Sequence, residues 1–481
     1  MIPSVWVILS VLNYLVVALV ILRILHRRRD PSGMLAWILA LLLLPILGLV
    51  FYLLAGDLPI QRKVRRRRRR RMKIEPGLSR QTAVLAESYD GRTREEGDAS
   101  RQSLMDVATR VGDTVVTLGN DVQVFYDAES AFLSLGLAIE EARSHVHMEY
   151  YIFADDETGR GMRDLLVRKA REGVEVRLLL DAVGCWRMSR SFVKSMRREG
   201  VAVAFFLPWG PTRRRLQLNC RNHRKLTVID GRVGFFGSKN IADEYLGRKK
   251  KFGPWRDTHL CVKGPCVAQL QEVFVEDWHF ATGEDLSSET YFATPEKAGE
   301  KLVQIIPSGP DCRAGMMHHL LNAVVSEARH SVSLLTAYFV PDSAMILALT
   351  SAAYRGLRVQ ILLPSRSDHW LVLWAGRSFY EELLESGVQI YEYDAGMLHS
   401  KEVIVDGRWA MVGSANMDIR SFRINFELTS MLYDTDLARR LQGNFDALRD
   451  DARQVTAEDV AQWSYGENLA TGLARLATPL L

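Results

Sequence analysis

Two histidines far apart in the chain each open the same spaced pattern of polar residues. Counted from each histidine, a lysine follows at +2, an aspartate at +7, a glycine at +14, a serine at +15 and an asparagine at +17. Chance rarely produces agreement at five offsets, so we interpret the two patterns as two halves of one active site. The first copy comprises His223, Lys225, Asp230, Gly237, Ser238 and Asn240, and the second comprises His399, Lys401, Asp406, Gly413, Ser414 and Asn416.

Paired imidazoles accompanied by lysines, without a cluster of carboxylates, indicate covalent phosphoryl transfer. One imidazole attacks phosphorus and becomes a phosphohistidine, while the other protonates the departing alcohol and then deprotonates the incoming one. The histidines, lysines and aspartates of both copies are therefore our catalytic candidates. The two serines and two asparagines, with the lysines, are candidates for holding the phosphate oxygens and the charge that develops on them. The residue types leave open which histidine attacks.

A nucleophilic histidine needs a partner for its second ring nitrogen, which fixes the tautomer and the orientation of the ring. Glu427, at +28 from His399, is the candidate in the second half, and Asp257 occupies the corresponding strand of the first half. Alternatives stay open for other residues. Asp230 and Asp406 each precede a glycine at a strand end, so they serve either the chemistry or only a turn. The Gly-Ser pairs are either phosphate contacts or tight backbone turns.

Two further features have competing interpretations. A metal site built on the two histidines would need additional Cys, His or carboxylate ligands, so we expect no metal and no other cofactor. The basic residues around the first histidine form either a solvated loop or a patch that steers an anionic substrate. They are Arg213, Arg214, Arg215, Arg221 and Arg224.

From residue 122 onward the chain runs through one arrangement of elements twice, and each run ends at a His-Lys pattern. Helices alternating with short Val, Ile and Leu runs predict two α/β halves. The patterns lie on strands, because residues 225–230 read KLTVID and residues 401–406 read KEVIVD, both rich in β-branched side chains. Side chains two apart on a strand face the same way. Two facing motif strands would therefore bring both His-Lys pairs into one cleft.

The N-terminal end is expected to anchor the chain in a membrane. Residues 2–22 are apolar apart from four polar positions, and residues 34–54 carry no charge. Each run is about 31 Å long as a helix at ~1.5 Å per residue, which matches the hydrocarbon core of a bilayer. No basic residue precedes the first run, unlike a cleaved signal peptide. The alternative is a pair of buried core helices.

The charges around these two runs predict their orientation. The connector is short, so the runs form a hairpin, and nine basic residues at 62–71 outweigh the four arginines of the connector. The positive-inside rule then places the C-terminal bulk in the cytoplasm. The basic run either contacts anionic headgroups, at about 1 kcal/mol per charge, or is only a topology signal. We divide the chain into an anchor (1–56), a polybasic juxtamembrane segment and linker (57–120), a first half (121–300) and a second half (301–481).

Composition restricts the class of protein. The net charge of +5 hides an uneven distribution: residues 1–73 hold 14 Lys and Arg against 2 Asp, which is +12, so the other 408 residues sum to −7. A nucleic-acid binder normally carries its positive charge on the folded domain. The five cysteines are an odd number without a CxxC pair, which argues against a disulfide framework or a cysteine zinc site.

The doubled HxKx4D pattern resembles that of the phospholipase D superfamily and, within it, the bacterial cardiolipin synthases. The likeness covers nearly the whole chain and is strongest at residues 31–56, 221–240 and 399–427. It implies two phospholipase D-like repeats that form a pseudo-two-fold catalytic unit, preceded by a transmembrane helical hairpin. It also implies conversion of two phosphatidylglycerol molecules into cardiolipin and glycerol, without a metal. By the family pattern His223 is the nucleophile, His399 is the general acid and then base, and the phosphate is bound by Lys225, Lys401, Asn240 and Asn416.

The resemblance and the apolar N-terminus agree on where the protein acts. We expect a multi-pass protein of the bacterial inner membrane whose catalytic part faces the cytoplasm. The expected partners are phosphatidylglycerol and anionic membrane lipids, and no nucleic acid. A homo-oligomer is left open.

Overall fold

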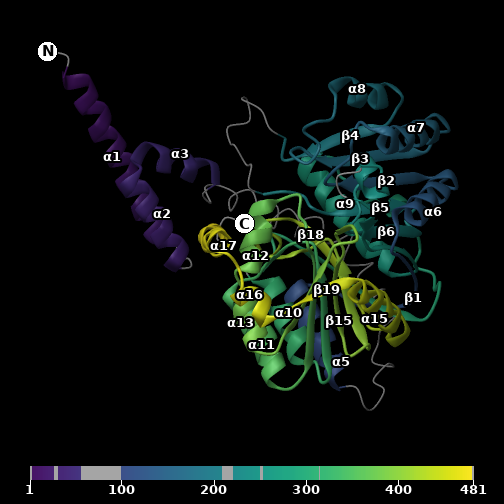
Figure 1. Cartoon of the computed structure of the whole chain (residues 1–481). Helices are drawn as coiled ribbons and strands as arrows, with labels where there is room; N and C mark the ends of the chain where they lie inside the picture. Colours follow the sequence, from purple (N-terminus) through teal and green to yellow (C-terminus); the bar gives the residue numbers. More distant parts are fainter. Residues whose placement is uncertain are drawn as a thin grey trace.

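A computed structural model of the chain describes residues 3–26, 31–55, 99–208, 220–249, 253–313 and 315–478. Three N-terminal helices project from a large α/β unit that holds all of the described strands (Figure 1). The predicted polybasic run at residues 62–71 lies outside the described residues, as do the arginines at 213–215.

The first predicted apolar span forms one helix, α1 (Pro3–Leu25). The second was predicted to be one continuous helix, and that prediction is wrong, because it is divided into α2 (Pro31–Leu43) and α3 (Pro45–Ala55). Pro45 causes the break: it lacks an N–H group and its ring collides with the carbonyl one turn earlier, so it starts a new helix instead of extending the old one. Across the described ranges, no single helix has both the length and the hydropathy of a membrane-spanning helix.

The first half begins with a strand and alternates strands with helices. β1 starts ahead of the predicted boundary at residue 121. The elements of this half are β1 (Val116–Phe125), α6 (Ala128–Glu140), β2 (His145–Tyr150), α7 (Glu157–Arg171), β3 (Glu175–Asp181), α8 (Arg190–Arg198), β4 (Ala202–Phe206), β5 (Lys225–Ile229), β6 (Val233–Gly237), a 3₁₀ turn (Asp243–Leu246), β7 (Trp255–Arg256), β8 (His259–Lys263), α9 (Cys266–Thr282) and a second 3₁₀ turn (Glu289–Tyr291).

The second half repeats this order and adds elements at its C-terminal end. They are β9 (Lys301–Ser308), α10 (Met316–Ser326), β10 (Ser331–Thr336), β11 (Phe339–Val340), α11 (Ser343–Tyr354), β12 (Arg358–Pro364), α12 (Trp370–Arg377), α13 (Tyr380–Glu385), β13 (Gln389–Tyr393), β14 (Met397–Leu398), β15 (Lys401–Val405), β16 (Trp409–Gly413), β17 (Met417–Asp418), α14 (Ile419–Arg423), β18 (Glu427–Leu432), α15 (Thr435–Asp450), β19 (Ala452–Val455), α16 (Ala457–Ala461) and α17 (Tyr465–Ala477).

One sheet of 15 strands joins the two halves, in the order β19-β13-β12-β10-β15-β16-β18-β9-β1-β8-β6-β5-β2-β3-β4. Reading outward from the central antiparallel pair β9–β1, both directions meet equivalent strands, and only β19 lacks a counterpart. The motif strands β5 and β15 occupy matching places in this order. The predicted α/β class with two related halves is confirmed, and the symmetry of the strand order places the two motifs equivalently about the centre.

Helices cover both faces of the sheet and produce its burial pattern. β5 and β15 are buried along their whole length, as expected for apolar strands in a sheet with both faces covered. One core cluster contains residues of both halves, including Leu226 and Phe274 from the first and Ile404 and Phe445 from the second. Two other clusters lie on the opposite face. One lies in the first half, and the other lies in the second half together with Val116 of β1 and residues of the segment before it. The halves therefore share a core and form one structural unit.

Acceptor side chains define the starts of several helices. The residue before each of α6, α7, α8, α11 and α15 lies in extended backbone and accepts a hydrogen bond from the backbone N–H three positions on. Such caps satisfy donors that have no partner within the helix. The five capping residues are Asp127, Asp156, Ser189, Asp342 and Asp434.

Helix α5 (Ala99–Gly112) lies within the segment at residues 57–120 that the sequence analysis assigns to a juxtamembrane region and linker. Leu104, Met105 and Ala108 form one face of this helix and enter the core of the second half beside Leu320. Residues three and four apart lie on the same side of a helix, so a short apolar stripe is enough to dock it. The end of the predicted linker is thus part of the folded unit.

Candidate active site

His223 and His399 each lie two residues before a motif strand, at a joint between the halves. The backbone N–H of His223 donates to the Phe426 carbonyl at 2.9 Å, and that of His399 donates to the Arg256 carbonyl at 2.7 Å. The short parallel pairing of β14 with β7 and the bridge between Asn222 and Phe426 make the same connections. The segment that carries each histidine is therefore positioned by the opposite half.

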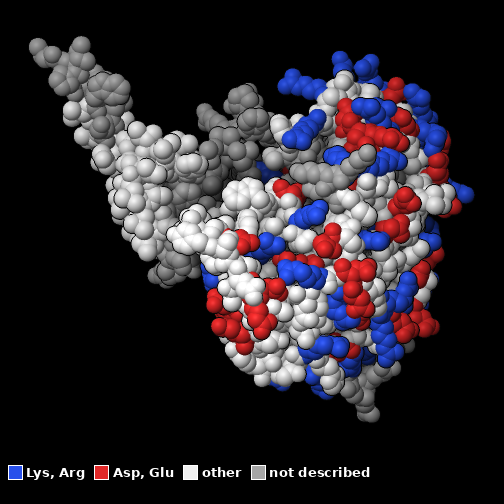
Figure 2. Space-filling view, in the orientation of Figure 1, with Lys and Arg blue, Asp and Glu red and all other residues white. Residues whose placement is uncertain are grey.

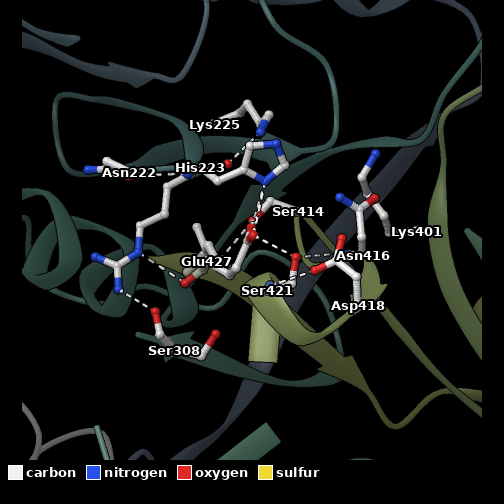
Figure 3. A network of polar contacts seen from close by, with 12 residues as sticks. Asn222, His223, Lys225, Ser308, Lys401, Ser414, Asn416, Asp418, Ser421 and Glu427 are labelled. Carbon is white, nitrogen blue, oxygen red and sulfur yellow. Dashed lines mark hydrogen bonds and ion pairs between the residues drawn. The ribbon is translucent and has the colours of Figure 1, made fainter. Parts of the chain in front are cut away.

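The side chain of His223 is paired with Glu427 (Figure 3). Its Nδ1 atom lies 2.9 Å and 3.0 Å from the two carboxylate oxygens, and the Glu427 side chain is fully buried. The carboxylate also accepts hydrogen bonds from Ser414 Oγ at 2.6 Å and Ser421 Oγ at 3.0 Å. These contacts hold the acid in one orientation against the imidazole.

His399 has an equivalent pairing with Asp257. Its Nδ1 atom lies 3.0 Å from Asp257 Oδ2, and the carboxylate is fully buried. The same carboxylate accepts hydrogen bonds from Ser238 Oγ, from the Thr258 backbone N–H at 3.0 Å and from the Trp255 indole at 3.3 Å. The site thus contains two His–carboxylate pairs.

The pairs are crossed between the halves, which corrects the expectation that each acid serves the histidine of its own half. Glu427 of the second half contacts His223, and Asp257 of the first half contacts His399. The cause is the strand order. The strands that start near these acids, β8 and β18, flank the central β9–β1 pair, so side chains at their starts reach the opposite half.

The two lysines bring charge into the same buried region. Lys225 Nζ donates to the His223 carbonyl, and Lys401 Nζ donates to the His399 carbonyl. Burial lowers the pKa of Lys225 well below its usual value and lowers the pKa of Lys401 to about 8. Each lysine also lowers the pKa of the histidine in the other half. The two motifs are therefore close enough for their charges to interact, and Figure 3 shows Lys225 next to His223 and Lys401 next to Asn416.

Burial is also the main influence on the two imidazoles. It lowers the pKa of His223 to about 4 against the opposing effect of Glu427, and it lowers the pKa of His399 against that of Asp257. Burial raises the pKa of each carboxylate, but the neighbouring imidazoles and lysines more than offset this and the net direction is downward. Each neutral imidazole therefore donates its Nδ1–H to an ionised acid. The lone pair of Nε2 is then available for attack or for accepting a proton.

Asp230 and Asp406, for which the sequence leaves a catalytic role and a turn role open, lie at the far ends of β5 and β15 from the histidines. Each has a positive φ, of 52° and 55°, and precedes a glycine that also has a positive φ. This is the Asp-Gly turn of a tight hairpin. Each carboxylate accepts three backbone N–H bonds: Asp230 from residues 143–145 at 2.8 Å, and Asp406 from residues 329–331 at 2.7–2.9 Å. The turn-anchor alternative is the one that the structure supports.

We predict that Asp406→Ala destabilises the fold without impairing the chemistry. It removes three hydrogen bonds to a charged acceptor and places alanine at positive φ, so the free energy of unfolding should fall by about 2 kcal/mol or more. Asp406→Asn keeps an acceptor oxygen and should lose less. Thermal unfolding and kcat, measured below the transition, check this. An unchanged melting temperature together with a kcat loss as large as that of a histidine variant would contradict the assignment.

The two motif serines contact the acids. Ser238 and Ser414 are fully buried and donate to Asp257 and Glu427, which helps to orient these carboxylates. The asparagines differ from each other. The Asn240 amide accepts from the Ile152 N–H at 3.0 Å and donates to the Tyr245 hydroxyl. In the described part of the chain, the buried Asn416 Oδ1 has no hydrogen-bond partner.

Comparison of the amino-acid sequence with those of known proteins identifies the family of this chain. The sequence model described as "Cardiolipin synthase, PLD-like domain" matches residues 136–278 and 321–449, and a model described as "Phospholipase_D-nuclease N-terminal" matches residues 3–56. A cardiolipin synthase from Geobacillus kaustophilus is 39% identical over 477 residues, which cover 98% of this chain and 93% of that protein. Cardiolipin synthase 2 from Bacillus cereus is 37% identical over 459 residues, covering 94% and 88%. The chain belongs to the cardiolipin synthase family of the phospholipase D superfamily.

A solved structure agrees at the level of the fold. The phosphatidylserine synthase of Haemophilus influenzae superposes with a TM-score of 0.60 at 14% identity, covering 79% of this chain and all of that one. At this identity the likeness concerns the fold alone.

Several residues around the two pairs were not predicted. The Tyr151 ring packs edge-on to His223 at 4.9 Å between ring centres, and Trp255 and Tyr245 pack against His399 at 5.4 Å and 6.0 Å. These rings contribute to the burial that lowers the pKa of both imidazoles. Their only sequence signal is position, because Tyr151 directly follows the residues of β2 and Trp255 lies two residues before Asp257.

Arg224, one of the basic residues around His223, is buried and does not lie in a solvated loop. It is paired with Asp277 in the interior, and it donates to the Glu427 carbonyl at 3.0 Å and the Ser308 carbonyl at 3.2 Å. Arg221 is buried as well, 3.9 Å from Asp181. These two arginines are not a solvated loop. Arg224 instead joins the first motif to the strand that carries the acid of His223.

Proposed function

We propose that this chain is a cardiolipin synthase that transfers the phosphatidyl group of one phosphatidylglycerol to a glycerol hydroxyl of a second, giving cardiolipin and free glycerol. Membership of the family supports the reaction. The observation that carries the mechanism is the crossed arrangement of two buried His–carboxylate pairs, with two lysines whose charges reach both histidines. Two imidazoles, one as nucleophile and one as proton carrier, are the parts that a two-step phosphoryl transfer requires.

In the first step, Nε2 of His223 attacks the phosphorus of the donor lipid. The bound phosphodiester anion raises the pKa of His399, so this imidazole is protonated at Nε2 when the reaction starts. A P–N bond forms, the bond from phosphorus to the glycerol oxygen breaks, and the Nε2 proton of His399 converts the leaving alkoxide into glycerol. Glu427 stabilises the positive charge that develops on His223, and Asp257 stabilises the protonated form of His399. The product of this step is a phosphatidyl-histidine.

In the second step, the hydroxyl of the acceptor lipid replaces glycerol. His399, now neutral, takes the proton of this hydroxyl, the oxygen attacks phosphorus, and the P–N bond breaks to restore His223. Aromatic residues around both imidazoles limit the access of water, which favours transfer over hydrolysis.

The phosphate-binding residues are proposed from charge and position. A phosphodiester anion raises the pKa of nearby ammonium groups, so substrate binding restores the full charge of Lys225 and Lys401 against the effect of burial. The two motif asparagines complete the proposed phosphate-binding site. The buried side-chain oxygen of Asn416 lacks a partner among the described residues. Asn240 is oriented by the Tyr245 hydroxyl and the Ile152 N–H.

We expect kcat/KM to fall as the pH rises above about 8. Lys401 is cationic below its pKa of about 8 and neutral above it, so alkaline solutions remove a charge that binds the substrate phosphate in the free enzyme. On the acid side, His223 stays neutral down to about pH 4 and loses its nucleophilic lone pair below it. In Lys401→Arg the guanidinium keeps its charge, so the alkaline decline should disappear. A wild-type profile that stays flat between pH 7 and 10 would contradict this role.

The N-terminal helices are proposed to anchor the enzyme as a multi-pass hairpin in the bacterial inner membrane, with the catalytic unit facing the cytoplasm. The match of residues 3–56 to the family's N-terminal model supports this. So do the exposed apolar side chains along α1, which include Val11, Leu15, Leu19 and Leu22, and the basic residues at 62–71.

A defined-lipid assay tests the proposed reaction. The full chain, reconstituted in phosphatidylglycerol vesicles labelled separately in the acyl chains and in the headgroup, should give cardiolipin and free glycerol in equal amounts. The His223→Ala and His399→Ala proteins are the negative controls, in which no cardiolipin should form. Phosphatidic acid as the sole lipid product would overturn the proposal and identify a hydrolase that uses the same residues.

A further inference from the structure

Helix α17 turns its apolar side away from the protein. Thr471 and Ala474 are buried, whereas four large side chains project outward: Tyr465, Leu469, Leu473 and Leu476 are 85%, 51%, 58% and 79% exposed. At about 100° per residue these four positions fall within one narrow arc of the helix. A surface helix of a soluble protein normally shows the reverse arrangement, with its apolar stripe against the core.

The orientation of α17 is fixed by its own contacts. At its start, Ser464 and Glu467 form a capping box, with the Ser464 N–H donating to the Glu467 carboxylate at 2.8 Å. Near its end, Arg475 donates to the Ser378 carbonyl at 2.8 Å and lies over the Phe379 ring. The two charged side chains of the helix are thus used at its ends, and the outward arc carries no charge. These contacts hold the helix in one orientation, and the leucines are exposed in that orientation.

This surface is connected to the active site through α12. α17 packs against α12, which begins with Trp370, a side chain that is 69% exposed. Two positions earlier, Asp368 accepts a hydrogen bond from the Tyr338 hydroxyl at 2.7 Å, and the Tyr338 ring lies 6.4 Å from that of His399. An exposed indole therefore lies a short distance along the surface from a motif histidine.

The first half has an exposed indole at the equivalent place. β3 and β12 are equivalent strands in the sheet, and Trp186 follows the end of β3 as Trp370 follows the end of β12. Trp186 is 71% exposed. The last residue of β3, Asp181, accepts a hydrogen bond at 2.9 Å from the backbone N–H of Asn222, the neighbour of His223. Each half thus has an exposed tryptophan a few residues beyond one of two equivalent strands, β3 and β12.

We propose that α17, together with Trp370 and Trp186, is a second membrane contact of the catalytic unit, which seats the active site on the bilayer surface independently of the N-terminal helices. Figure 1 places α17 and α12 on the side of the α/β unit that faces α1–α3, and Figure 2 shows a surface with few charges over the same region. Because this surface lies on the same side of the protein as the apolar N-terminal helices (Figure 1), the partner that covers it is a lipid bilayer. Indole and phenol rings favour the headgroup level, and a leucine stripe on a helix inserts just below it.

The first test measures insertion directly and does not depend on the proposed reaction. In the full chain, Leu473→Cys is labelled with an environment-sensitive fluorophore and reconstituted in vesicles whose acyl chains carry bromine. The matched control is Leu133→Cys on α6, where the leucine is 65% exposed on the far side of the unit (Figure 1). Labelled wild-type protein reports the background of the native cysteines, four of which are buried.

We expect bromolipids to quench the label at position 473 at least twofold and to leave the label at 133 unchanged. Equal quenching at the two positions would overturn the proposal. Protection of position 473 from aqueous iodide without quenching by bromolipids would also overturn it, because the occupant would then be protein, either α1–α3 of this chain or a second copy.

The second test rests on the proposed function. Leu469→Gln combined with Leu473→Gln should lower the rate on vesicles of long-chain phosphatidylglycerol at least tenfold and change the rate on a soluble short-chain phosphatidylglycerol less than twofold. Leu133→Gln with Leu137→Gln, a pair with the same spacing and similar exposure on α6, should change neither rate. Equal losses on both substrates would mean that the stripe supports the fold and would overturn the proposal. If the wild-type protein made no cardiolipin, the proposed function would fail while the quenching result would still decide the membrane contact.

Discussion

The His399→Ala protein is expected to accumulate a lipid–phosphohistidine adduct on His223, and the His223→Ala protein to form none. Either change should lower transfer at least ~10⁴-fold, because the nucleophile and the proton carrier act as one unit. The decisive substrate has an activated alcohol, such as p-nitrophenol, in place of glycerol. Such a leaving group needs no proton, so His223 can still attack when His399 is absent, whereas the second step lacks its base.

Mass spectrometry of peptides that contain His223 measures the adduct, and release of nitrophenol in a single turnover measures the first step. The exposed His330, changed to alanine, is the control for loss of an imidazole outside the site. An adduct that forms only in the His223→Ala protein would reverse the two roles. Normal turnover in either variant would remove both histidines from the mechanism.

Glu427→Gln is expected to abolish adduct formation, whereas Asp257→Asn should preserve it and block only its breakdown. The difference follows from the crossed pairs, because Glu427 holds the Nδ1–H of His223 and Asp257 holds that of His399. An amide cannot stabilise the imidazolium and permits the wrong tautomer. In a comparable His–Asp pair, replacing the aspartate with asparagine lowers kcat ~10⁴-fold.

The same activated substrate distinguishes the two variants. If each acid served its own half, the outcomes would be exchanged, with Asp257→Asn blocking the first step. Glu392→Gln is the matched control, because Glu392 is a buried acid of the second half that is paired with Arg377 at 3.0 Å, away from both histidines. That change should lower the melting temperature and leave the ratio of the two steps unaltered.

The amino-acid sequence by itself determined much of this protein. The repeated offsets identified both histidines and both lysines, and the alternation of helices with β-branched runs indicated two α/β halves. These features depend on neighbours along the chain: a run of β-branched residues favours a strand, and an Asp-Gly pair at a strand end forms a turn. Local chemistry also explains why the turn role of Asp230 and Asp406 was already among the alternatives.

Only the tertiary structure showed which side chains that are distant in the sequence contact each other. The crossed pairing of Glu427 with His223 and of Asp257 with His399 depends on the central β9–β1 pair, and residues separated by 204 and 142 positions carry no spacing signal. The same holds for the burial of Ser238 and Ser414 behind the acids. It also holds for the docking of α5 on the second half. Burial then sets the pKa values, because desolvation depends on everything packed around a group and not on the residue type.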